Sequence, residues 1–134
     1  YVHPLEAEAV GLLGSLDRVL AADVVSPITV PPHDNPAMDG YAVRFADLSP
    51  GTETTLVRVG ESFAGKPSSA TVGSGQCVRI FTGGVMPAGA DTVVMQERAR
   101  AAGKSIAFAA GQRQGQNVRE AGEAYAIGPA EPQA

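Results

Sequence analysis

The sequence has a single cysteine, Cys77, and no tryptophan, and aromatic residues make up only 5% of its 134 residues. One cysteine cannot form an internal disulfide, which excludes a disulfide-stapled fold and fits a reducing compartment. No apolar run approaches the length of a membrane span, and the N-terminus lacks the basic-then-apolar layout of a signal peptide. We therefore expect a cytoplasmic protein with no membrane partner.

Basic residues are also scarce. Ten Lys and Arg stand against fourteen Asp and Glu, which gives a net charge of −4 and a pI near 5.0. Nucleic-acid binding depends on clustered Lys and Arg that neutralise phosphates, so this balance predicts no nucleic-acid partner. The two histidines, His3 and His33, and the one cysteine cannot supply a four-ligand zinc site.

Glycine and proline are abundant, with 16 and 10 copies, and 44% of the residues are hydrophobic. After residue 40 the apolar runs are short and are bounded by Gly, Pro, Ser or Asp; they cover residues 41–43, 56–59, 78–81, 92–95 and 106–108. Short, closely spaced strands with turn signals between them are typical of a β-sandwich or barrel. The sequence therefore predicts a mainly β fold, in which Arg58 and Arg79, each flanked by aliphatic residues, mark the polar faces of half-buried strands.

The N-terminal region differs from the rest in composition. Apolar residues recur there with the helical period, at Leu12, Leu13, Leu16, Val19 and Leu20. Because glycine is unfavourable in a helix interior, we expect a short helix that begins near Ser15, after Gly11 and Gly14. Residues 24–30 favour an edge strand or an extended linker. We predict a helical segment at 1–26, a β domain at 27–126 and a tail without periodicity at 127–134.

The segment PPHDNPAMDGYAV, residues 31–43, combines three prolines and a glycine with two carboxylates. The prolines fix backbone angles, and Asp39 followed by Gly40 favours a tight reversal, so Asp34 and Asp39 are carried on a stiff loop that enters a strand. Rigid loops of this kind present binding or catalytic side chains. The alternative is a well-formed loop whose acids are simply solvated.

The stretch TGG at residues 82–84 follows the predicted strand 78–81. Thr82 would carry its hydroxyl and nearby N–H groups to the lip of a turn, where they could contact an anion, and Gly83 would let the backbone approach a ligand closely. In the alternative interpretation the hydroxyl only hydrogen-bonds its own turn.

Several other sequence patterns favour structural roles. The stretch GESFAGKP, residues 60–67, resembles a phosphate-binding loop but places Pro67 where Ser or Thr is required, so we expect an ordinary turn. No G-x-S-x-G element and no Asp-Thr-Gly or Asp-Ser-Gly element is present, which argues against a serine hydrolase and an aspartic protease. Cys77, beside a strand, is expected to be a buried small hydrophobe and not a reactive thiol.

Four blocks of the sequence, in order, resemble the N-terminal part of the molybdopterin molybdenumtransferase family, the MoeA and gephyrin E-domain group. They are LDRVLAADVVSPITVPPHDNPAMDGYAV (16–43), VGESFAGKP (59–67), VRIFTGGVMPAGADTVVMQE (78–97) and GQNVREAGE (115–123). The resemblance implies a fold of bent, irregular β-sheets, with the N-terminal helix belonging to a neighbouring, incomplete lobe. It covers nearly all of this chain but only about the first third of a family enzyme.

The resemblance also implies an activity. Family members insert molybdenum from molybdate into adenylylated molybdopterin in a Mg²⁺-dependent reaction, and they act as homodimers. The acid of the family's P-A-M-D-G-Y block falls on Asp39 and the threonine of its R-I-x-T-G block falls on Thr82, and both are associated there with activity. Asp34 and Gly83, beside them in the same blocks, are predicted cofactor contacts.

The sequence departs from the family pattern at three places. His33 stands where an aromatic residue is usual, Pro36 where Ser is common, and Ala124 where the family typically has an acid. The pterin-binding domain of a family enzyme would follow the segment seen here, so we expect this segment to be inactive alone. The alternative hypothesis is a non-catalytic binding or dimerisation module derived from the family.

Overall fold

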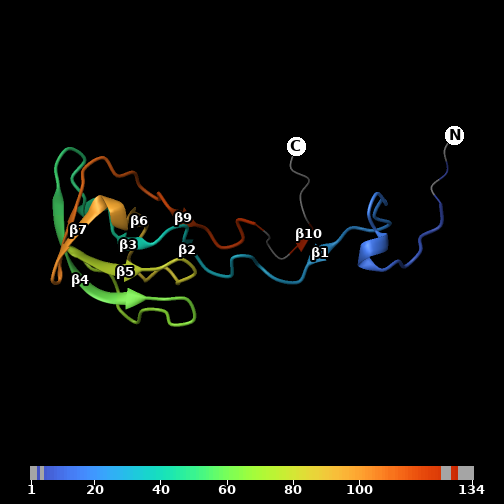
Figure 1. Ribbon diagram of the computed structural model, residues 1–134, viewed down its shortest axis with the longest axis horizontal. Coiled ribbons are helices and arrows are strands. Elements are labelled where there is room, and N and C mark those ends of the chain that lie inside the picture. Colours follow the sequence, from blue (N-terminus) through green and yellow to red (C-terminus); the bar gives the residue numbers. More distant parts are fainter. Residues whose placement is uncertain (1–2, 4, 125–127, 130–134) are drawn as a thin grey trace.

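The computed structural model describes residue 3, residues 5–124 and residues 128–129. Its centre is a six-stranded sheet in the order β6-β3-β5-β4-β8-β7. These strands are β3 (Gly40–Val43), β4 (Thr54–Ser62), β5 (Gln76–Ile80), β6 (Thr92–Met95), β7 (Ala99–Ala102) and β8 (Ser105–Phe108). Strands β4 and β5 run parallel, and the other neighbours are antiparallel. The sheet is strongly curled (Figure 1), which confirms the predicted mainly β, bent architecture.

Alternating side chains bury both faces of the central strand β3. Tyr41 and Val43 point into the larger core cluster, where Tyr41 meets Phe108 edge-on with ring centroids 5.5 Å apart. Ala42 points to the opposite face and packs with Ile80 and Val93. A strand buried on both faces must be apolar at every position, as β3 is.

Gly40 fixes how closely β3 and β6 approach each other. A Cβ added at Gly40 would lie 2.1 Å from the backbone oxygen of Val94, a distance at which one of the strands would have to move. Gly40 pairs with Ile80 of β5 on one side and with Met95 of β6 on the other. The start of β3 is thereby held between the C-terminal ends of two strands.

Short elements complete the described part of the chain. Strand β1 (Val25–Ser26) pairs with β10 (Gly128–Pro129), and β2 (Asn35–Pro36) pairs with β9 (Val118–Arg119). Three single 3₁₀ turns are η1 (Leu12–Gly14), η2 (Phe45–Asp47) and η3 (Gln96–Arg98). Of the predicted tail at 127–134, residues 128–129 form a strand, and the others lie outside the described residues.

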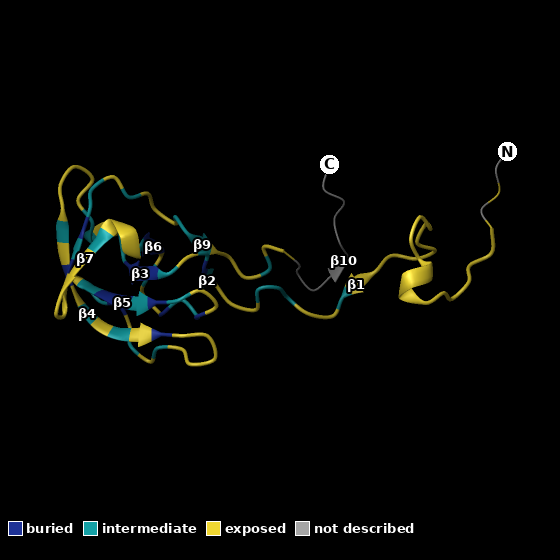
Figure 2. Cartoon of the chain, viewed as in Figure 1, coloured by how far each residue is buried: buried dark blue, intermediate teal, exposed yellow. Residues whose placement is uncertain are grey.

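The helix predicted from near Ser15 is wrong. The described residues before β1 contain only the 3₁₀ turn η1, and Asp17 has a positive φ of 63° that interrupts any helix. The apolar side chains of the expected stripe are exposed, Leu13 and Val19 by 97% and 95%. Most helical stability comes from packing an apolar face, and this segment extends away from the sheet with nothing against it (Figures 1 and 2). No described helix is long and apolar enough to cross a membrane.

Strand β4 has the opposite phase to the one predicted. Leu56 and Ser62 are buried, whereas Val57 and Val59, expected to be inside, are 48% and 38% exposed. Arg58 is half-buried and lies on the same face of β4 as Leu56, whereas the two exposed valines lie on the other face. The pairing with β5 shifts register between Arg58 and Gly60, but burial alternates without a break along β4.

Two other predictions from sequence are confirmed. The stretch after β4 is an ordinary turn, in which Phe63 and Lys66 exchange backbone hydrogen bonds of 3.0 Å around Gly65. Cys77 is fully buried in the larger cluster, and burial raises the pKa of its thiol to about 12, so it is held as a neutral, inert group.

The close approach at Gly40 generates a stability prediction. We expect Gly40→Ala to lower the free energy of unfolding by more than about 3 kcal/mol, because the new methyl group collides with the β6 backbone. Gly51→Ala is the matched control, since a Cβ there meets nothing within 4 Å. Urea unfolding followed by far-UV circular dichroism measures both variants. Equal stability of the two would contradict the assigned role of Gly40.

Candidate functional site

The strand register brings Asp39 beside Thr82, although they are 43 residues apart in the chain. Asp39 directly precedes β3, and Thr82 lies two residues beyond the end of β5. Because β3 and β5 are antiparallel and Gly40 pairs with Ile80, the residue before β3 faces the turn after β5. The two residues predicted as catalytic therefore meet at one rim of the sheet.

Asp39 and Thr82 are joined by two hydrogen bonds. The backbone N–H and the hydroxyl of Thr82 both donate to Oδ1 of Asp39, at 2.8 and 2.9 Å. Thr82 is exposed and Asp39 is half-buried, so the pair is accessible from solvent. The alternative in which the Thr82 hydroxyl bonds only its own turn is wrong, because the hydroxyl reaches across to another strand.

The turn that carries Thr82 explains the two glycines after it. Gly84 donates its N–H to the carbonyl of Phe81 at 2.8 Å, which closes a four-residue turn. Gly83 occupies its third position with a φ of 82°, in the region that favours glycine. The geometry thus gives Gly83 a conformational role, and its predicted cofactor contact stays a prediction.

The hydrogen bonds keep Asp39 ionised. The backbone N–H of Thr82 and then its hydroxyl lower the pKa of Asp39 below its ordinary value; burial opposes them to a smaller extent, and the nearby charge of Arg79 adds the smallest lowering effect. Because the pKa is lower in the folded state, these contacts stabilise the fold at neutral pH. That contribution is lost as the pH falls from the ordinary value through the lowered one.

The pair keeps oxygen lone pairs free for a further ligand. Both Thr82 donors are used on Oδ1, and among the described residues no hydrogen bond reaches Oδ2 of Asp39 or the oxygen of the Thr82 hydroxyl as an acceptor. An ionised carboxylate with no spare donor beside it repels an anion and attracts a cation or a hydrogen-bond donor. Within the described parts of the chain, no group of three or more His, Cys, Asp or Glu side chains is placed to hold a metal ion.

The other acid of the stiff loop, Asp34, has a different setting. Its Oδ1 accepts the N–H of Ala121 at 2.8 Å, and its backbone oxygen accepts the N–H of Met86 at 3.0 Å. Asp34 is exposed and lines an open depression of about 470 Å³ together with His33 and Met86. The depression does not include Asp39 or Thr82, so the structure separates Asp34 from the Asp39–Thr82 pair, and its predicted cofactor contact stays a prediction.

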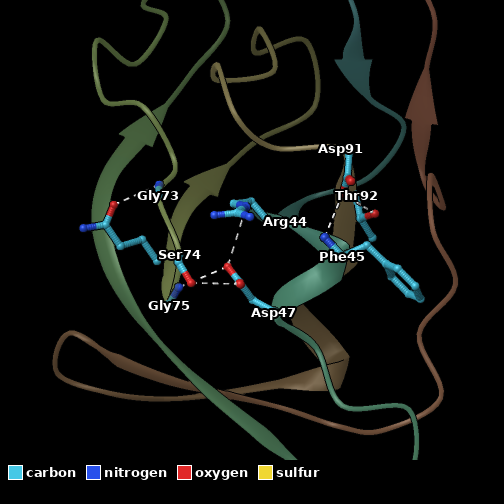
Figure 3. Close-up of polar contacts among 9 residues, drawn as sticks. Arg44, Phe45, Asp47, Gly73, Ser74, Gly75, Asp91 and Thr92 are labelled. Atoms are coloured by element: carbon cyan, nitrogen blue, oxygen red, sulfur yellow. Dashed lines mark hydrogen bonds and ion pairs between the residues drawn. The ribbon is translucent and has the colours of Figure 1, made fainter.

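Two further carboxylates, Asp47 and Asp91, hold loops together (Figure 3). Asp47 accepts from the Ser74 hydroxyl at 3.2 Å and from the N–H of Gly75 at 3.0 Å. Asp91 accepts from the N–H of Phe45 and from the Thr92 hydroxyl, much as Asp39 accepts from Thr82. Thr92, however, is buried, and its oxygen accepts the N–H of Gly115 at 3.0 Å, which leaves this second Asp–Thr pair closed to ligands.

Arg79 and Gln96 also lie at this rim and were not predicted from the sequence as site residues. Arg79 pairs directly with Tyr41 across β3 and β5, and its Nη2 donates to Oε1 of Gln96 at 2.6 Å. Gln96 also donates its backbone N–H to the backbone oxygen of Asp39 at 3.2 Å. The sequence signal that could have placed Arg79 here is the two-residue period of a strand. It puts Arg79 on the same face as Phe81, the residue immediately before Thr82.

The curled sheet and its accessible acid–hydroxyl rim define a β domain with a candidate binding or catalytic rim. The chain belongs to the family described as MoeA N-terminal region (domain I and II), whose model matches residues 2–130. This membership confirms the family that the four sequence blocks indicated.

Individual relatives agree. The chain is 42% identical over 121 residues to the molybdopterin molybdenumtransferase of Haemophilus influenzae, covering 90% of this chain and 30% of the relative. It is 40% identical over 126 residues to the enzyme of the same name from a Nostoc species, covering 92% of this chain and 29% of the relative. A crystal structure of the molybdopterin biosynthesis moeA protein from Pyrococcus horikoshii OT3 superposes with a TM-score of 0.78 at 34% identity, over 90% of this chain and 33% of that chain. The chain thus spans about a third of the length of these proteins.

The shared hydrogen bonds of Thr82 lead to a prediction for the pKa of Asp39. We expect Thr82→Val to raise that pKa, because the hydroxyl donor is lost, but not fully to its ordinary value, because the backbone donor remains. Carbon-13 NMR titration of the Asp39 carboxyl measures the change. Thr82→Ser retains the hydroxyl and serves as the control; a valine variant that titrates like wild type would show that the hydroxyl does not stabilise the carboxylate.

Proposed function

We propose that this chain is the N-terminal portion of an enzyme that transfers molybdenum from molybdate to adenylylated molybdopterin, and that Asp39 and Thr82 form one wall of its active site. The observation that carries the proposal is the accessible Asp39–Thr82 pair, built from two distant blocks of the sequence and left with open oxygen atoms. Family membership over residues 2–130 and the names of the relatives support the substrate class.

The chemistry of the pair suits a Mg²⁺-dependent reaction. Oδ2 of Asp39 and the Thr82 hydroxyl oxygen are hard oxygen donors, and Mg²⁺ is commonly held by one or two carboxylates while water and substrate phosphates complete its shell. The residues present therefore fit as part of a Mg²⁺ site, with Asp39 as the charged ligand. When bound there, the ion would neutralise negative charge on the phosphate groups of the nucleotide-linked pterin.

The remaining groups of the site must come from outside the described residues. These residues contain no cluster of three metal-binding side chains, and the rim is open to solvent, with Asp39 half-buried and Thr82 exposed. An exposed rim excludes water poorly, so the reaction needs a second wall that buries the substrates. We propose that the wall is supplied by the pterin-binding part of a longer protein, which acts in the cytoplasm as a homodimer. Analytical ultracentrifugation of the full-length protein measures its oligomeric state.

A second candidate, a binding or dimerisation module without catalysis, is favoured by one observation. Ala124 is exposed, and its N–H donates to the oxygen of Val30 at 3.0 Å, so the chain places a methyl group at a solvent-facing position where the resemblance implies an acid. The open reading frame after Ala134 and an assay of the full-length product distinguish the two candidates. Molybdenum insertion by that product would exclude the module.

The proposed role of the pair is tested in the full-length protein. We expect Asp39→Asn to lower the rate of molybdenum insertion at least about tenfold, because the charge is lost while the shape is kept. Thr82→Ala should lower the rate by a similar factor. The rate is measured by formation of molybdenum cofactor from molybdate and adenylylated molybdopterin.

The control is Glu53→Gln, which removes a carboxylate from an exposed ion pair with Arg100, whose N–O distance is 2.9 Å. It should leave the rate unchanged, and circular dichroism should show that all three variants are folded. Full activity of both Asp39→Asn and Thr82→Ala would refute the site.

A further inference from the structure

Arg79 is held on every side by groups next to the proposed site. Its guanidinium carbon lies 5.0 Å from the ring centre of Tyr41 in β3 and 4.6 Å from that of Phe81, the residue after β5, so two aromatic rings contact the group. Nη1 donates to the backbone oxygen of Gly40 at 3.0 Å, and Nη2 donates to Oε1 of Gln96 at 2.6 Å. The planar, forked shape of arginine is what allows stacking and two directed hydrogen bonds at once.

Each of these partners is a direct neighbour of Asp39 or Thr82. Gly40 follows Asp39 in the chain, Phe81 precedes Thr82, and Gln96 donates its N–H to the backbone oxygen of Asp39 at 3.2 Å. One side chain thereby connects the start of β3, the end of β5 and the end of β6, the three backbone segments that meet at the site.

The stack continues through Phe81 to a fourth side chain. Phe63 packs on Phe81 with ring centroids 4.6 Å apart and an angle of 9° between the rings, and the Phe81 N–H donates to the oxygen of Ser62 at 3.2 Å. Phe81 is therefore clamped between Arg79 and the residues that follow β4. A clamped Phe81 fixes the backbone that delivers the N–H of Thr82 to Asp39.

We propose that Arg79 is a positioning residue, which holds Asp39 and Thr82 at hydrogen-bonding distance through Gly40, Phe81 and Gln96. Aromatic rings contact the guanidinium, and two of its five N–H donors bond to groups of this rim, which favours a positioning role over direct binding of substrate. The consequence of Arg79 for catalysis rests on the proposed function, whereas its effect on the Asp39–Thr82 contact can be measured in this chain alone.

The first experiment measures the contact directly. Arg79→Lys keeps the positive charge and most of the stem but loses the planar fork, and we expect the amide hydrogen of Thr82 to exchange with solvent at least about tenfold faster by NMR. The amides of Val78 and Val93 in the sheet should keep their wild-type rates. Arg100→Lys, which changes an exposed arginine paired with Glu53, is the control and should leave the Thr82 rate unaltered.

Two outcomes would overturn the proposal at this stage. An unchanged exchange rate at Thr82 would show that Arg79 does not hold the contact. Equal acceleration at Thr82, Val78 and Val93 would show that Arg79 supports the sheet generally and has no particular role at this rim.

The second experiment tests the catalytic consequence in the full-length enzyme. Arg79→Lys should lower kcat several-fold with little change in KM, since it misplaces groups without removing one that binds substrate. In a Thr82→Ala background the same substitution should have a smaller effect, because the contact it supports is already lost. Equal effects in the two backgrounds would overturn the proposed route through Thr82.

Failure of this inference is distinguishable from failure of the proposed function. If Asp39→Asn retains full activity, the proposed function of the Asp39–Thr82 pair is refuted. The exchange rate at Thr82 still decides whether Arg79 positions the pair. If Asp39→Asn is inactive and Arg79→Lys is fully active, the pair is functional and the positioning role of Arg79 is refuted.

Discussion

The pairing of β3 between β5 and β6 is the constraint on which the rest of the structure depends. Gly40 has no side chain, and the backbone of Val94 occupies the space where one would be. Because this contact sets the register of three strands, it also determines that the residue before β3 meets the turn after β5. The Asp39–Thr82 pair is therefore a product of backbone packing, and the side chains only complete it.

The strands and the residues of the rim could be predicted from the sequence, because both depend on short-range patterns. Apolar runs bounded by Gly and Pro located β3, β5, β6 and β8, and the concentration of chain-steering residues around Asp39 marked that loop as rigid. The contact between Asp39 and Thr82 could not be read from spacing, since it follows from register across a sheet. The role of Arg79 was hidden for the same reason, since its partners come from three separate segments of the chain: β3, the turn after β5 and the 3₁₀ turn after β6.

The missing N-terminal helix and the reversed phase of β4 share a different cause. Hydrophobic periodicity indicates which side chains could face a core, but it does not supply the core. The apolar stripe between Leu12 and Leu20 has no partner surface in the described structure, so its period alone does not stabilise a helix. In β4 the alternation of Val57 and Val59 with Arg58 suits an inner apolar face, but the buried side chains are Leu56 and Ser62, so alternation alone did not identify which face points inward.

The order of the strands along the chain has a consequence for how the domain is made. Strand β3 pairs with β5 and β6, and both of these neighbours are synthesised after it. Strand β4 likewise pairs with β8, which is synthesised later. With few local pairings to nucleate it, such a topology folds slowly relative to its length. On the ribosome the apolar strand β3 has no neighbour until β5 has emerged, and it lacks its second neighbour until Met95 has followed, so over that interval the nascent chain exposes an apolar segment, a natural substrate for a holding chaperone.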